Sequence, residues 1–151
     1  MSWPSLLLLW WAATGWTQEL RMGVFVGNND GHPADQQLLF ADADARKMHD
    51  LFVSFGGIAP AHALLVQGAS RRSVEHALDQ VHRKVVEAAN AGQHSTLVFY
   101  YSGHGDDQGL HLGPTALAHE ELRRLLNHTG ADVRLALLDA CQSGGAVRSK
   151  G

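Results

Sequence analysis

Short apolar runs recur along the chain at intervals that predict four β-strands. They lie at 21–27, 63–67, 95–103 and 133–140, and the third contains five consecutive apolar residues at 97–101. A strand that is apolar at every position, rather than at every second one, is typical of a parallel sheet covered on both faces. We therefore expect buried strands that give way to polar or glycine-rich turns.

The segments between these runs carry apolar residues at helical spacing. One helix is expected over 41–55, where glycines end it, and another over 119–127. A longer amphipathic helix begins at a serine cap, Ser70 or Ser73, and ends near Gly92. The predicted apolar faces of the first and of the longest helix are Ala45, Met48, Leu51, Phe52 and Phe55, and Val74, Ala77, Leu78, Val81, Val85 and Ala88.

This alternation of strands and helices predicts the α/β class. Because helical crossovers between parallel strands cover the faces of the sheet, we expect a three-layer sandwich with a mostly parallel sheet flanked by helices. A brief extra strand or a turn is expected at 110–113. The length of 151 residues suits one domain with a sizeable core.

The first residues differ from the rest of the chain. The apolar stretch at 6–13 is shorter than the roughly 20 residues that span a bilayer. It fits the hydrophobic region of a secretory signal peptide, although no Lys or Arg precedes it. We expect a signal peptide at 1–17 and export to the periplasm or the medium, and the alternative is a buried N-terminal helix.

Composition limits the classes of partner. The formal net charge is −3 and the basic residues are scattered, so no basic patch favours nucleic acid or an anionic membrane surface. The chain has one cysteine, Cys141, and therefore no internal disulfide. An unpaired cysteine in an exported protein needs an explanation, either a reactive thiol or a partner.

Two of the apolar runs end on residues that can carry chemistry. His104 lies between Gly103 and Gly105 after one run, and Cys141 follows another, 37 positions later. Because the carboxyl ends of parallel strands meet at one edge of a sheet, we expect the imidazole and the thiol to converge there. The thiolate is the nucleophilic form of cysteine, and a nearby imidazole can take its proton and later protonate a leaving amine.

The glycines on either side of His104 have three expected roles. Gly103 and Gly105 would adopt backbone angles closed to other residues, and they would leave space for a substrate. Their amides, with the amide of Cys141, could stabilise a developing oxyanion.

Simpler interpretations stay open for each of these residues. His104 could be a turn histidine bonded to nearby main chain, and Cys141 could be a small buried side chain. A redox role for Cys141 lacks a resolving partner. A metal site lacks any C-x-x-C or H-x-x-x-H spacing. Its candidate ligands would be His104, Asp106, His111 and Cys141.

Taken together, "FYYSGHG" and the later "LLDACQSG" resemble the caspase–metacaspase superfamily of cysteine peptidases, of the bacterial caspase-like type. The resemblance covers 22–145, where "GVFVGNND" looks like the opening strand and turn and "FADADARKM" like the first helix. It implies a caspase-like sandwich with 18–151 as the catalytic domain. It also implies His104 as acid and base, Cys141 as nucleophile, and the amides of Gly105 and Cys141 as the oxyanion hole.

The same resemblance implies a substrate preference. Asp139 stands where metacaspases have aspartate and animal caspases have glutamine, and Asp44 matches a second metacaspase aspartate, with Asp42 its near competitor. Two carboxylates suit a P1 Arg or Lys side chain. The alternative for Asp42 and Asp44 is helix capping or interaction with the helix dipole. No cofactor is required, and although some metacaspases need calcium, nothing here has calcium-loop spacing.

The chain stops ten residues after Cys141, whereas members of the superfamily continue with further strands. We therefore expect a large-subunit part that is truncated on its C-terminal side. A missing C-terminal, small-subunit-like segment or a partner chain would complete the sheet and the cleft, since an open sheet edge favours pairing. The expected function is a cysteine endopeptidase that acts on polypeptides. The alternative is a catalytically silent caspase-like module for assembly or signalling.

Overall fold

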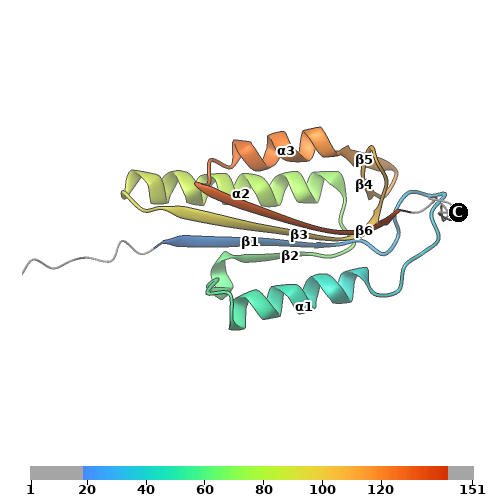
Figure 1. Cartoon of the computed structure of the whole chain (residues 1–151), viewed down its shortest axis with the longest axis horizontal. Coiled ribbons are helices and arrows are strands. Elements are labelled where there is room, and N and C mark those ends of the chain that lie inside the picture. The colour runs from blue at the N-terminus through green and yellow to red at the C-terminus, as the bar shows by residue number, and fades with distance from the viewer. Residues whose placement is uncertain (1–18, 143–151) are drawn as a thin grey trace, which may run out of the picture.

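The computed structural model describes residues 19–142, with side chains described as far as Ala140. The predicted signal peptide at 1–17 lies outside the described residues. Six strands form one sheet in the described part of the chain (Figure 1). They are β1 (Leu20–Gly27), β2 (Ala63–Val66), β3 (Ser95–Gly105), β4 (Gly109–Leu112), β5 (Thr115–Ala118) and β6 (Val133–Gln142). The helices are α1 (Ala41–Ser54), α2 (Arg71–Asn90) and α3 (His119–His128), with a short 3₁₀ turn, η1 (Pro60–His62).

The sheet is mostly parallel, as predicted. β3 is its centre and pairs in parallel with β1 on one side and with β6 on the other, and β1 pairs in parallel with β2. β4 and β5 form an antiparallel hairpin that joins the end of β3 where Gly105 pairs with Leu110. The hairpin turns at Gly113, whose φ of 72° suits glycine. The sequence predicted a brief strand or turn where β4 lies, and it did not predict β5.

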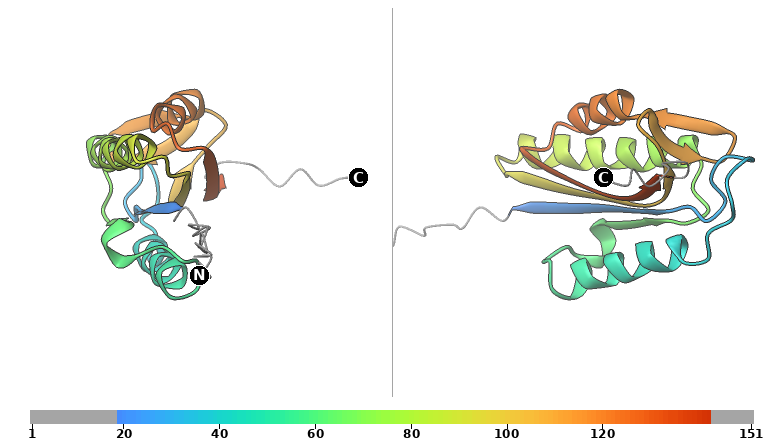
Figure 2. Two further views of the ribbon diagram at one scale, coloured as in Figure 1. Left: turned by 90° about the vertical axis from the view of Figure 1, so that its left-hand side faces the viewer. Right: turned by 45° about the vertical axis from the view of Figure 1, so that its right-hand side comes forward.

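Helices cover both faces of the sheet and give three layers (Figures 1 and 2). α1 packs on one face, where Ala45 joins a buried cluster with Phe25 and Tyr100. α2 and α3 pack on the other face around a larger cluster that includes Phe99 and Tyr101. The predicted α/β sandwich is confirmed.

α2 follows its predicted pattern closely. All six of its predicted apolar residues are buried. Ser70 is the N-cap: its hydroxyl accepts the N–H of Ser73, and the Ser73 hydroxyl accepts the N–H of Ser70. No helix in the described residues is long and apolar enough to cross a membrane.

α1 departs from its predicted face. Leu51 is 48% exposed and Phe55 is 86% exposed, whereas Met48 and Phe52 pack partly against the core. Leu51 and Phe52 are adjacent and so point about 100° apart on the helix, which leaves only one of them over the sheet. Phe55 is the C-cap residue, at which the chain leaves the helical path.

β6 lies at an edge of the described sheet, as expected for a chain without further strands, but it is less buried than its apolar run predicts. Among the described strands it pairs only with β3. Its exposed apolar side chains are Val133, Leu135 and Leu138, at 57%, 47% and 43%. A groove of about 320 Å³ runs between this strand and α3.

Candidate active site

His104 and Cys141 are direct neighbours in the sheet. They are register partners in the parallel ladder between β3 and β6, at the carboxyl ends of both strands. Paired main chains in a sheet lie about 4.8 Å apart. The structure therefore brings the two main chains together as predicted. Both residues lie inside their strands, however, and the prediction that they follow them is wrong.

The glycines flanking His104 provide space rather than unusual backbone angles. Neither Gly103 nor Gly105 has a positive φ, which corrects the expectation of unusual backbone angles. A Cβ on Gly103 would lie 2.4 Å from the Tyr101 hydroxyl, and a Cβ on Gly105 would lie 3.0 Å from the carbonyl oxygen of Gly109. The Tyr101 hydroxyl thus occupies the position of a Cβ at Gly103, whereas at Gly105 a Cβ would make only a tight contact.

The His104 ring is buried and held by a distant carbonyl. It is 4% exposed, and its Nε2 lies 2.6 Å from the main-chain oxygen of Gln36, 68 positions earlier. A carbonyl can only accept a hydrogen bond, so Nε2 carries a proton. In the neutral ring Nδ1 then has a free lone pair, and this buried atom has no hydrogen-bond partner among the described residues. The simpler interpretation of His104 is therefore correct in that the ring is bonded to main chain, but His104 lies in a strand rather than a turn, and its partner is distant in sequence.

The residues at 28–40 form a loop that closes over this histidine. Gly31 has a φ of 62°, and a Cβ there would lie 2.5 Å from Cδ2 of His104 and 2.6 Å from Oδ2 of Asp35. Asn28 anchors the start of the loop: its amide donates to the oxygen of Ala69 at 2.7 Å and its Oδ1 accepts the N–H of Gly31 at 3.2 Å. The loop therefore fits against the imidazole without space for a side chain at Gly31.

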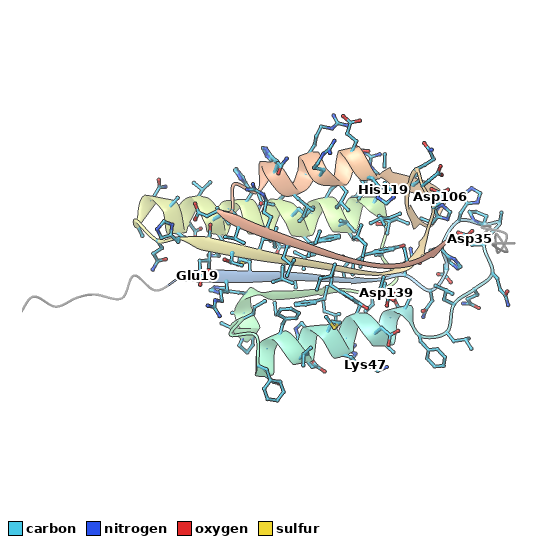
Figure 3. All side chains as sticks on the ribbon, viewed as in Figure 1. Glu19, Asp35, Lys47, Asp106, His119 and Asp139 are labelled. Carbon is cyan, nitrogen blue, oxygen red and sulfur yellow. The ribbon has the colours of Figure 1, made fainter. Side chains whose placement is uncertain are left out.

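Two carboxylates lie near Tyr100 on the α1 side of the sheet. The Tyr100 hydroxyl donates to Oδ2 of Asp139 at 3.4 Å, and Figure 3 shows Asp139 on that side. Burial raises the pKa of Tyr100; a hydrogen bond with Ser102 lowers it, and the negative charges of Asp139 and Asp44 raise it further. Since side chains alternate along a strand, Tyr100, Ser102 and His104 share one face of β3. The carboxylates and the histidine thus lie on the same side of the sheet.

Asp42 and Asp44 have different partners. Asp42 accepts hydrogen bonds from the Asn29 amide and from the N–H of Gly68, both at 3.1 Å, and so ties two loops together. Asp44 pairs with the exposed Lys47 ammonium at 2.9 Å. These contacts favour a structural role for Asp42 and leave Asp44 as the carboxylate that a ligand could approach.

A charged cluster lies beside the loop at the same edge of the sheet, where Figure 3 shows Asp35 and Asp106. Nδ1 of His111 lies 2.6 Å from Oδ2 of Asp35, and its Nε2 lies 3.1 Å from Oδ2 of Asp106. No group of three or more His, Cys, Asp or Glu side chains in the described part of the chain is arranged to hold a metal ion.

The imidazole and the two carboxylates of this cluster stabilise one another's charged forms. Burial lowers the pKa of His111, but hydrogen bonds and charge from Asp35 and Asp106 outweigh it and raise the pKa above its ordinary value. Burial raises the pKa of Asp35, yet hydrogen bonds from His111 and from the N–H of His32 bring it below its ordinary value. The N–H of Gln108, then His111, lower the pKa of Asp106.

Comparison with known families agrees with this architecture. The family model described as the caspase domain matches residues 20–151. The chain belongs to the caspase domain family. No curated protein matches the chain significantly. A caspase domain is a cysteine peptidase fold, and its substrates are polypeptides.

Sequence reasoning named Asp106 and His111 only as candidate metal ligands, and it missed the loop of this caspase domain that surrounds the histidine. Gln36 contributes only a main-chain oxygen, which no residue type reveals. Asp35 and His111 are 76 positions apart, and their spacing shows no periodicity. The one available signal was the concentration of Asp, His and Gly in "NNDGHPAD", which reads as an ordinary turn.

Proposed function

We propose that this caspase domain is a cysteine endopeptidase in which Cys141 is the nucleophile and His104 the general acid and base. The pairing of His104 with Cys141 at the carboxyl edge of the sheet is the observation that carries the proposal. The buried Nδ1 of His104 supports it, because a lone pair without a hydrogen-bond partner among the described residues can accept the thiol proton.

The reaction would run in two steps. Nδ1 of His104 takes the proton of the Cys141 thiol, and the thiolate attacks the carbonyl carbon of the scissile bond. The tetrahedral intermediate collapses as the imidazolium protonates the leaving amine, which leaves a thioester on Cys141. Water, deprotonated by the same imidazole, then hydrolyses the thioester and regenerates the thiol. The amides of Gly105 and Cys141 would stabilise the oxyanion in both steps.

We propose that Asp44 and Asp139 bind the side chain of a P1 Arg or Lys residue. Support comes from the position of both carboxylates near Tyr100, on the face of the sheet that carries His104. A guanidinium or ammonium group would form charge-assisted hydrogen bonds with the pair. The ion pair between Asp44 and Lys47 offers a precedent on this surface, since Asp44 already holds an ammonium group.

Among the described strands β6 pairs only with β3, and its other edge motivates a proposal about assembly. A further strand, from a C-terminal segment or from a partner chain, would pair with β6 and cover Val133, Leu135 and Leu138. Export by a signal peptide at 1–17 remains our proposal for the location, testable by N-terminal sequencing of the mature protein.

An affinity label tests the peptidase directly. Two proteins are incubated with a peptidyl-Arg chloromethyl ketone: the chain by itself, and a longer product of its gene that contains the chain. The intact mass of each protein is then measured. We expect one adduct on Cys141 that is lost in His104→Ala, and weaker labelling by the matched peptidyl-Asp reagent. No adduct with either chain would contradict the proposal and would favour a silent module for assembly or signalling.

A further inference from the structure

The cluster of Asp35, His111 and Asp106 has no part in the reaction proposed above, yet it lies one residue from the carbonyl that holds His104. We propose that His111 is a positioning residue, which fixes the 28–40 loop through Asp35 so that the Gln36 carbonyl keeps His104 in the Nε2–H form. This inference rests on the proposed peptidase function only for its kinetic consequence. The geometry of the histidine can be measured in any case.

The path of contacts is short and continuous. His111 contacts Asp35 at 2.6 Å, Asp35 precedes Gln36 in the chain, and the Gln36 oxygen lies 2.6 Å from Nε2 of His104. Asp35 also accepts the N–H of His32 at 2.7 Å, and its own N–H donates to the His32 oxygen at 2.8 Å, which makes 32–35 a compact turn. A displacement of Asp35 would therefore move the carbonyl next to it.

The hairpin that carries His111 is held independently of its imidazole. The Tyr101 hydroxyl contacts two main-chain oxygens, that of His104 at 2.7 Å and that of His111 at 3.2 Å. Asp106 also accepts the N–H groups of Gln108 and Gly109, at 2.8 and 3.0 Å. β4 should thus keep its place when the imidazole is replaced, and the loss would fall on the 28–40 loop.

The charges around His111 support a clamp that depends on pH. Asp35 faces it from the loop and Asp106 from the turn between β3 and β4, and both are carboxylates. The His32 ring lies 6.3 Å from the His111 ring. Two further histidines contact or influence its partners: His104 acts on Asp35 by charge when it is protonated, and Nε2 of His119 lies 2.9 Å from the main-chain oxygen of Asp106. The imidazolium of His111 lies between two carboxylates, and such charge-assisted hydrogen bonds are stronger than neutral ones.

Two substitutions separate the two sides of the clamp. The amide nitrogen of asparagine can stand in for Nδ1 of histidine, so His111→Asn can still donate to Asp35. The longer His111→Gln can reach Asp106 in place of Nε2 but loses Asp35. The matched control is His94→Gln, because His94 pairs with Asp132 at 3.6 Å and is 82% exposed at the opposite end of β3.

The experiment uses the full chain with ¹⁵N-labelled histidine and reads the ring tautomer of His104 by NMR. We expect the Nε2–H form in the wild type, in His111→Asn and in His94→Gln, and a mixture of tautomers in His111→Gln. An unchanged His104 tautomer in His111→Gln would overturn the inference. Equal disturbance in both His111 variants would also overturn it, since the link to Asp35 would then not be the cause.

Kinetics with a peptidyl-Arg substrate give the second readout. We expect kcat of His111→Gln to fall by about ten- to a hundredfold with KM within about twofold, because a small misplacement of a catalytic group acts on the chemical step. His111→Asn and His94→Gln should keep wild-type kcat near neutral pH. An active wild type with equal kcat in His111→Gln would refute the clamp alone. A wild type without activity would refute the peptidase proposal and leave the tautomer measurement to decide on the clamp.

Discussion

Nε2 of His104 lies 2.6 Å from the main-chain oxygen of Gln36, on a loop that precedes it by 68 positions. This contact fixes a proton on Nε2 and leaves the lone pair on Nδ1. An acceptor that is a main-chain group can be moved only with its loop. The residues that hold the loop in place therefore determine which nitrogen of the imidazole carries the proton.

Removal of either member of the proposed dyad should abolish peptidase activity without unfolding the domain. We expect kcat/KM for a peptidyl-Arg substrate to fall at least about 10³-fold in Cys141→Ala and in His104→Gln. Circular dichroism should show an unchanged fold, and His94→Gln should keep full activity. Residual activity within tenfold of the wild type in Cys141→Ala would show that another nucleophile operates.

Gly31→Ala should impair both stability and activity. Its φ of 62° disfavours a side chain, at a cost of about 1 kcal/mol. The new Cβ would also press on Cδ2 of His104 and could lower kcat by about 10²-fold.

Gly68→Ala is the matched control for this substitution. Gly68 has a similar φ of 57°, but nothing lies within 4 Å of a Cβ placed there. In Gly68→Ala the free energy of unfolding, measured by urea titration, should fall by a similar amount, and kcat should stay at the wild-type value. Equal loss of kcat in both variants would show that contact with His104 is not the cause.

The three aspartates should respond differently to conversion into asparagine. In Asp44→Asn and Asp139→Asn we expect kcat/KM for a P1 Arg substrate to fall by about tenfold or more, with little change in stability. Asp42→Asn should instead lower the free energy of unfolding by about 1–3 kcal/mol, because it accepts two hydrogen bonds between loops. A loss of activity in Asp42→Asn alone would reverse the assignment of the specificity residue.

The stabilising effect of the His111 cluster should be confined to a window of pH. The raised pKa of His111 makes its contribution complete below the ordinary histidine pKa, and this contribution is lost as pH rises through the raised value. The pKa values of Asp35 and Asp106 are lowered, so the contribution of these carboxylates to stability is complete above the ordinary carboxyl pKa. This contribution is lost as pH falls through the lowered values.

The difference in free energy of unfolding between the wild type and His111→Gln should therefore be largest from about pH 4 to about pH 6.5. Urea titrations across this range measure it. A difference that does not vary with pH would contradict an ionic role for His111.

Much of the fold could be predicted from the sequence because it follows local periodicity. The six buried positions of α2 and its cap at Ser70 depend on spacing within one helix, as do the approximate bounds of β1 and β3. The placement of His104 at the edge of the sheet followed from the rule that the carboxyl ends of parallel strands lie at the same edge.

The remaining details depend on contacts between distant residues. Gly103 and Gly105 read as turn glycines, whereas they make room for Tyr101 and for the main chain of Gly109. The open edge of the described sheet beside β6 was expected only from the family resemblance, because no pattern within the strand shows whether a further strand pairs with it. The preference for Asp44 over Asp42 became visible only through the partners of each carboxylate.

The coupling between His104 and Cys141 can be measured most directly by alkylation. Cys141 is the only cysteine in the chain, so the rate of reaction with iodoacetamide reports this thiol alone. Because the thiolate is the reactive form, we expect the native wild type at neutral pH to react at least about tenfold faster than His104→Gln, with equal rates for both in urea. Equal rates in the native state would contradict the dyad.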